Sequence, residues 1–163
     1  MNVTFETMSF EHKEAVMDIY NYYVNNSLAA YPDDVLPYEY YEKFLDMTKC
    51  YPAYVIKEND KIVGFCLLHA YNPFPTFKEC AEISYFISPQ HTGKGLGTKA
   101  LKRLEEDALK VGIKTILANI SSMNSRSIDF HKKNGFVECG RFQKIITKMG
   151  TPFDIIWMQK TLK

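Results

Sequence analysis

The stretch Ser88–Leu101 reads SPQHTGKGLGTKAL, and it decides how the rest of the chain is interpreted. Its three glycines, Gly93, Gly95 and Gly97, alternate with other residues where an apolar helical pattern begins. Glycine lets the backbone approach a ligand closely, and the free N–H groups at the start of a helix attract negative charge. The stretch therefore predicts an anion-binding turn between a strand and a helix, the alternative being a tight turn without a ligand.

The residues around the glycines separate three classes of anionic ligand. A nucleoside triphosphate loop requires GxxxxGK followed by serine or threonine, and the chain has no such string. A dinucleotide-binding turn requires GxGxxG early in a βαβ unit, followed by an acidic residue about 20 positions later. Here the spacing is GxGxG, and the next expected strand, TILANIS (115–121), carries no acid. The third ligand is coenzyme A. The turn can bind its pyrophosphate, and its pantetheine arm can run along the strand that precedes the turn.

The composition is that of one folded domain. The 163 residues are 46% hydrophobic and 24% charged, so we expect a single domain over residues 1–163. A net charge of +1 lacks the basic excess of a general nucleic-acid binder, and no nucleic-acid partner is expected. The apolar runs are too short to span a bilayer and the first ten residues do not resemble a signal peptide, which predicts a cytoplasmic protein without membrane binding. The four cysteines show neither CxxC spacing nor clustering with histidines, so no metal site is expected.

Apolar periodicity and turn residues predict the order β-α-α-β-β-β-α-β-α-β-β. In the segment 53–71, two β-rich runs are joined by Glu58-Asn59-Asp60-Lys61, which is typical of a hairpin. Strands that are separated by helices in this order need crossovers, so the order mixes hairpins with crossovers. The sequence therefore predicts an α/β fold with a mixed central sheet of about seven strands and four helices. The helices are expected to begin near Ser9, Pro37, Gly95 and Asn124.

Two elements of the sequence carry a resemblance to a known family. The stretch QHTGKG (90–95) resembles the Q/RxxGxG/A signature of the GNAT family of N-acetyltransferases. Downstream, Asn124 followed by SRSIDFHKKNGF resembles that family's second cofactor element, a helix led by asparagine and closed by Gly-Phe. The stretches 19–31, 81–88 and 148–162 are similar to the phosphinothricin and methionine sulfoximine acetyltransferase branch. The resemblance covers nearly the whole chain and implies the GNAT fold and acetyl-CoA as cosubstrate.

The resemblance also implies two catalytic residues. An amine acceptor with a pKa near ~8 must lose a proton before it can attack, so a base has to lie within reach. Glu82, in CAEISYF, matches the branch's general-base glutamate, and its apolar neighbours can raise its pKa. His131 matches the position where most relatives carry a tyrosine, and an imidazole can orient the acetyl group or donate a proton. From the residues alone, a solvated strand glutamate and a packing histidine are the alternatives.

The expected acetyl-CoA site combines the glycine turn with the strand before it and the asparagine-led helix. Main-chain N–H groups of the strand that contains Tyr85–Ile87 can stabilise the oxyanion of the acetyl group only if they lack a partner in the sheet. We therefore expect this strand to diverge from the strand that contains Ala118. Asn124 is expected to hydrogen-bond the pantetheine arm, a role compatible with capping its helix. The cofactor-binding residues are predicted to be Tyr85, Phe86, Ile87, Gly93, Lys94, Gly95, Leu96, Gly97, Thr98 and Asn124.

The acceptor is predicted to be a small amino-acid-like amine of the phosphinothricin or methionine sulfoximine type. Its pocket is assigned to Tyr31, Phe74, Phe77, Lys78 and Lys148, although these aromatic residues could equally be core. The loop AYNPFPTFKEC (70–80) departs from the branch, because Asn72 stands where an arginine is expected and Lys78 is its only basic residue. Lysine does not replace arginine at a bidentate anion site, so the acceptor's identity is open.

The function expected is direct acetyl transfer from acetyl-CoA to the acceptor amine in a ternary complex, with Glu82 as the base. Two alternatives are kept: a non-catalytic acyl-CoA-binding sensor domain, and an acetyltransferase for peptide or protein amines. The resemblance also implies a homodimer, closed by segments near the C-terminus and the acceptor loop.

Overall fold

The computed structural model describes residues 2–163, and its elements follow the predicted order. The strands are β1 (Val3–Thr7), β2 (Ala53–Glu58), β3 (Lys61–Ala70), β4 (Cys80–Ile87), β5 (Thr115–Ser121), β6 (Val137–Lys148) and β7 (Thr151–Thr161). The helices are α1 (Lys13–Asn26), α2 (Tyr41–Met47), α3 (Leu96–Lys110) and α4 (Ser125–Lys133). The prediction of a mixed α/β fold with seven strands and four helices is confirmed.

The seven strands form one sheet in the order β1-β2-β3-β4-β5-β7-β6. Neighbours pair antiparallel throughout, except that β4 and β5 run parallel. The expected hairpin joins β2 to β3, and its two turn residues Asn59 and Asp60 have φ values of 51° and 68°, as a type I′ turn requires.

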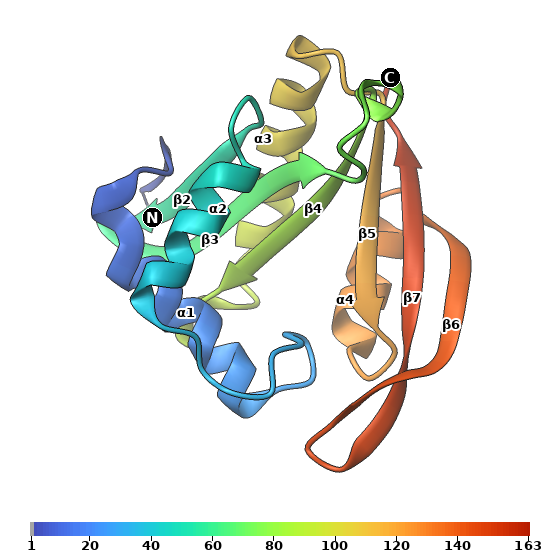
Figure 1. Cartoon of the computed structure of the whole chain (residues 1–163). Helices are drawn as coiled ribbons and strands as arrows, with labels where there is room; N and C mark the ends of the chain where they lie inside the picture. Colours follow the sequence, from blue (N-terminus) through green and yellow to red (C-terminus); the bar gives the residue numbers. More distant parts are fainter. Residues whose placement is uncertain (1) are drawn as a thin grey trace.

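The sheet opens between β4 and β5, as predicted. The two strands pair at only three positions, Cys80 with Thr115, Ala81 with Ile116 and Glu82 with Leu117. Beyond Glu82 they diverge, and Figure 1 shows the wedge between them widening along both strands. The edge of β4 that faces this wedge therefore has backbone groups without a ladder partner, while its other edge stays paired with β3 as far as Ile87.

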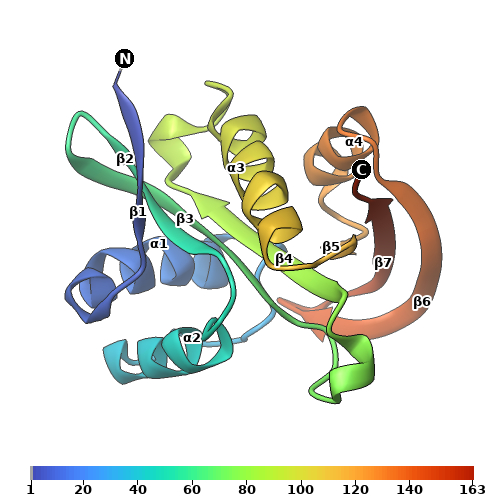
Figure 2. The ribbon, with the colours of Figure 1, turned by 90° about the horizontal axis from the view of Figure 1, so that it is seen from above.

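Helices cover both faces of the sheet. Figure 2 shows α1 and α2 on one face and α3 and α4 on the other. The apolar face of α3, which includes Leu101 and Leu104, packs on the sheet in the larger core, and Tyr41 and Phe44 of α2 pack with Phe65 in the smaller core. Over residues 2–163, no helix is both long and apolar enough to cross a membrane.

Side chains brace the open end of the wedge. Lys148, at the end of β6, is only 3% exposed, and its ammonium group donates hydrogen bonds to the carbonyl oxygens of Val24, Ser27 and Ala30 at 2.6–2.9 Å. The β6–β7 hairpin thereby contacts the loop after α1, as Figure 1 shows at the lower end of the molecule. In the same region, Tyr31 donates a hydrogen bond to the Asn119 side chain on β5 at 2.6 Å.

Candidate active site

The glycine turn has the backbone conformation that its sequence predicts. Gly93 and Gly95 have φ values of +76° and +81°, in the left-handed region that residues with a Cβ atom rarely adopt. The space that a Cβ would occupy is open at both positions, so glycine is required here for conformation rather than for room. α3 begins at the next residue, Leu96, which is 1% exposed and fixes the helix start against the core. The first N–H groups of α3 are left without helical acceptors and can bind an anion.

A cavity of about 480 Å³ lies between this turn, β4 and α4. It is lined by all of the predicted cofactor residues except Lys94, namely Tyr85, Phe86, Ile87, Gly93, Gly95, Leu96, Gly97, Thr98 and Asn124. The Lys94 ammonium instead lies 3.6 Å from the carboxylate of Glu58 at the end of β2. The backbone of the turn, rather than the lysine side chain, therefore faces the cavity.

Two features of this cavity were not anticipated from sequence. Arg126, in the first turn of α4, lines the cavity and brings a positive charge that suits a phosphate group. Tyr23 of α1 also lines it and donates a hydrogen bond to the Ile87 carbonyl at the end of β4. Asn124 is the N-cap of α4, with its side-chain oxygen accepting the Ser127 N–H at 3.2 Å.

A second cavity of about 320 Å³ begins where β4 and β5 separate. Glu82 and Tyr31 line it, and residues of α1 and α2 such as Tyr20 and Phe44 close one side. Six residues line both cavities: Ala29, Tyr85, Phe86, Asn124, Ser127 and His131. The two cavities therefore meet at the wedge in the sheet, with the carboxylate on one side of the junction.

Glu82 is placed where burial changes its chemistry. Its side chain is 18% exposed, and desolvation raises the pKa of its carboxyl group, opposed by the nearby His69. His69 is its direct partner across the β3–β4 ladder, and the Nε2 atom lies 3.9 Å from the Glu82 carboxylate. This pairing could not be read from the sequence, because the two strands are joined by a loop whose length does not fix their register.

His131 lies on α4 with both ring nitrogens engaged. Its Nδ1–H donates to the Ser127 carbonyl at 2.7 Å, which leaves Nε2 to accept a hydrogen bond from the Tyr85 hydroxyl at 2.6 Å. Burial lowers the pKa of His131 and raises that of Tyr85, so both side chains are neutral near pH 7. Tyr85 was predicted only for its main chain, and its side chain turns out to be the hydrogen-bond partner of His131.

We expect Tyr85→Phe to lower the free energy of unfolding by about 1–2 kcal/mol, because the buried Nε2 of His131 loses its donor. Urea denaturation of the variant measures this loss. Tyr22→Phe is the control, since Tyr22 is 44% exposed and its change removes a hydroxyl that faces solvent. Equal stability of the two variants would contradict the importance of the Tyr85–His131 bond.

Comparison with known proteins agrees with this geometry. The sequence model of the acetyltransferase (GNAT) family matches residues 16–136. This chain belongs to the GNAT acetyltransferase family. It is 31% identical over 150 residues to an L-amino acid N-acyltransferase of Escherichia coli, covering 91% of this chain and 87% of the relative. It is 30% identical over 150 residues to the L-methionine sulfoximine/L-methionine sulfone acetyltransferase of Salmonella typhimurium, covering 91% and 88%.

Solved structures of GNAT proteins share the fold over the whole chain. A phosphinothricin acetyltransferase from Sinorhizobium meliloti in complex with acetyl-CoA superposes with a TM-score of 0.93 at 25% identity, covering 99% of this chain and 89% of that one. An acetyltransferase of Salmonella typhimurium with its cofactor acetyl-CoA gives 0.92 at 28% identity, covering 100% and 95%. The predicted family, the GNAT fold, the N-acetyltransferase class and acetyl-CoA as cosubstrate are thereby confirmed.

Of the acceptor residues predicted for this GNAT chain, only Tyr31 lines the Glu82 cavity. Phe74, Phe77 and Lys78 are exposed in the loop between β3 and β4 and lie outside the linings of both cavities. Lys148 also lies outside the linings of both cavities. Its ammonium group donates hydrogen bonds to three backbone carbonyl oxygens.

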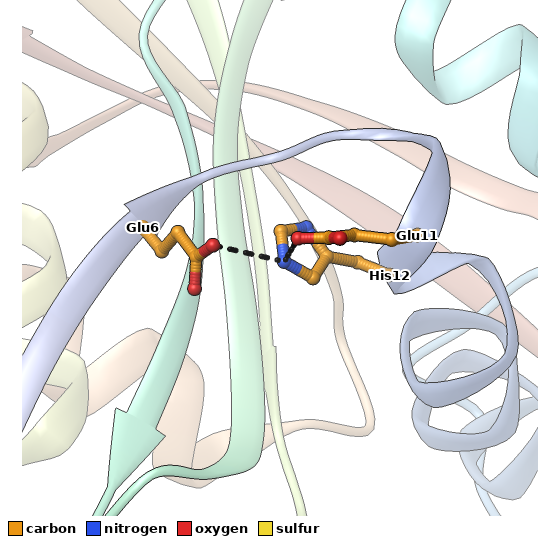
Figure 3. Close-up of side chains that lie close together, drawn as sticks. All are labelled: Glu6, Glu11 and His12. Carbon is orange, nitrogen blue, oxygen red and sulfur yellow. Dashed lines mark ion pairs between the residues drawn. The ribbon is translucent and has the colours of Figure 1, made fainter.

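One cluster outside the GNAT cavities has the composition of a metal site. Glu6, Glu11 and His12 have ligand atoms within 4.8 Å of one another, and Figure 3 shows both carboxylates directed at the histidine ring. However, the His12 Nδ1 accepts the Ser9 N–H at 3.0 Å, so the ring proton of the neutral side chain is on Nε2, 3.6 Å from each carboxylate. An Nε2–H group is a donor and not a metal ligand. Lys57 also pairs with Glu6, so one of the two carboxylates already has a cationic partner.

Proposed function

We propose that this GNAT enzyme transfers the acetyl group of acetyl-CoA to the amine of a small amino-acid-like acceptor by direct attack in a ternary complex. The observation that carries the proposal is the junction of the two cavities at the wedge, with Glu82 in the smaller cavity and the glycine turn in the larger. Both substrates can occupy such a site together, so no acyl-enzyme is needed. The printed activities of the relatives, on L-amino acids and on methionine sulfoximine or sulfone, support this acceptor class.

In the proposed mechanism, Glu82 accepts the proton of the acceptor's ammonium group. The freed nitrogen lone pair attacks the acetyl carbon, and N–H groups of β4 that face the wedge stabilise the charge that develops on the carbonyl oxygen. As the C–S bond breaks, the sulfur takes up the second proton that the attacking nitrogen loses. This transfer takes place beside the Tyr85–His131 pair, whose side chains line both cavities. The raised pKa of Glu82 suits a base that works near neutral pH.

The lining of the acceptor cavity suggests how the acceptor is held. Among the residues that the structure describes, no lysine or arginine lines this cavity, whereas Tyr20, Tyr31, Tyr40, Ser84 and Asn119 bring hydroxyl and amide groups. We infer that an anionic group of the acceptor is bound by neutral donors. Its carboxylate then contributes less to affinity than it would opposite a bidentate arginine.

The test is thiol release from acetyl-CoA against methionine sulfone, methionine sulfoximine, phosphinothricin, common amino acids, their carboxamides, polyamines and a peptide. Turnover of one small acceptor, with a carboxamide used within about tenfold of the free acid, supports both parts of the proposal. Turnover of the peptide alone would favour the alternative acceptor class. Acetyl-CoA binding without turnover of any acceptor would favour the sensor domain.

The homodimer is a further part of the proposal. Long exposed segments of β6 carry apolar side chains, including Val137, Phe142 and Ile145, which are each more than half exposed in the isolated chain. A second copy covering this face would remove that apolar area from water. Sedimentation velocity distinguishes the dimer from the 18.9 kDa monomer.

A further inference from the structure

We propose that His69 is a positioning residue that shares a proton with Glu82, and this inference rests on the proposed role of Glu82 as the base. The two residues face each other in the β3–β4 ladder, and directly opposed residues of an antiparallel pair project to the same face of the sheet. The side chains of His69 and Glu82 are 17% and 18% exposed, so both keep a limited contact with solvent.

The hydrogen bonds of His69 define which nitrogen faces the base. Nδ1 lies 2.9 Å from the carbonyl oxygen of Ala70, which can only accept, so Nδ1 carries a proton. In the neutral ring Nε2 is then a lone pair, and it lies 3.9 Å from the Glu82 carboxylate. A lone pair and a carboxylate repel each other unless one of them is protonated. A proton placed on either atom relieves this repulsion.

Few other titratable groups surround the pair. Cys80, two residues before Glu82 on the same face of β4, and Tyr31, from the loop after α1, have their pKa values raised by burial and by the Glu82 charge. Both are neutral in the range where a carboxyl group titrates. On the β5 side, Asn119 is uncharged and bonded to Tyr31. His69 is thus the one group of the described residues shown to lower the pKa of Glu82.

The pair gives the abstracted proton a path out of the cavity. Glu82 takes the proton from the acceptor amine, and the nitrogen lone pair forms the bond to the acetyl carbon. Because 3.9 Å is too long for a direct hydrogen bond, the proton then moves to Nε2 of His69 through one bridging water. From the imidazolium it passes to solvent, which restores the carboxylate and the neutral ring. The proton released by the amine is thereby balanced without any further reactant.

The experiment compares wild type with His69→Gln and His69→Leu, neither of which can titrate. Without the imidazolium, the pKa of Glu82 should rise by roughly one pH unit, read from its side-chain carboxyl ¹³C shift in the free protein. The acid limb of the kcat/KM profile, measured with one acceptor, should move to higher pH by the same amount. That shift corresponds to about a tenfold loss below the limb. Two substitutions are used so that the test remains possible if one of the variants fails to fold.

Cys80→Ser is the matched control, because it changes a neutral neighbour of Glu82 and should leave both readouts unshifted. In a Glu82→Gln background, His69→Gln should cause no further loss, since His69 acts only through the carboxylate. A Glu82 titration that is the same in wild type and both His69 variants would overturn the inference. The carboxyl titration needs no turnover, so it still decides the inference if no acceptor in the panel is used and the proposed function fails.

Discussion

Glu82→Gln is expected to reduce kcat/KM about 10²- to 10⁴-fold while leaving acetyl-CoA affinity unchanged. Glutamine keeps the size of the side chain but cannot accept the proton of the acceptor's ammonium group. Glu82 lines the acceptor cavity and not the cofactor cavity. The substitution should therefore reduce turnover without changing the affinity for acetyl-CoA. Thiol-release assays give kcat/KM, and calorimetric titration with acetyl-CoA gives the affinity for the cosubstrate.

Glu79→Gln is the control for this variant. Glu79 lies three residues earlier, is exposed, and pairs with Lys114 on the surface. Its loss should leave kcat/KM within about twofold of wild type, because an exposed ion pair contributes little to the structure. If Glu82→Gln kept the activity of the Glu79 control, another group or water alone would be the base.

Lys148→Met is expected to lower the free energy of unfolding by about 3 kcal/mol. Methionine preserves much of the buried aliphatic volume but leaves the carbonyls of Val24, Ser27 and Ala30 without their donor. Each unpaired buried carbonyl costs about 1–3 kcal/mol, and the entry of water offsets part of that sum. For a chain of 163 residues the loss corresponds to a fall in Tm of roughly 6–12 °C.

Lys132→Met on the outer side of α4 is the matched control. Lys132 is exposed, so the same substitution there should change Tm by no more than about 1–2 °C. Thermal unfolding followed by circular dichroism compares the two. A Lys148 variant as stable as the Lys132 variant would mean that water or a shifted loop replaces the ammonium group without cost.

The sequence was sufficient to predict the glycine turn, because the residues that determine it are adjacent in the chain. Gly93 and Gly95 take a conformation that few other residues adopt, and the order of strand, turn and helix is written in adjacent residues. The wedge between β4 and β5 was also foreseeable, since the chemistry expected of the strand required free N–H groups. The turn depends on neighbours along the chain, whereas the wedge was expected from the chemistry that the resemblance implies, and the structure agrees with both.

The side chains that complete the site were harder to predict because their partners are distant in sequence. Lys148 was assigned to the acceptor pocket, yet it donates hydrogen bonds to carbonyl oxygens more than a hundred residues earlier. The pairing of His69 with Glu82 depends on a register that the intervening loop does not encode. Tyr85 lies three residues after Glu82 on β4, so the two side chains point to opposite faces of the sheet. The partner of Tyr85 is His131 on α4, which only the packing of that helix against β4 reveals.

The short contact between β4 and β5 is also the fixed end of the wedge. Any change in the width of the wedge turns the two halves of the sheet about the three paired positions, and displacement grows with distance from them, as along a lever. Glu82 lies in the last of these pairs, whereas Ile87 and Ser121 lie at the far ends of the two strands. Glu82 therefore lies where such a change would move the backbone least, and Lys148 and Tyr31 brace the opposite end, where it would move most.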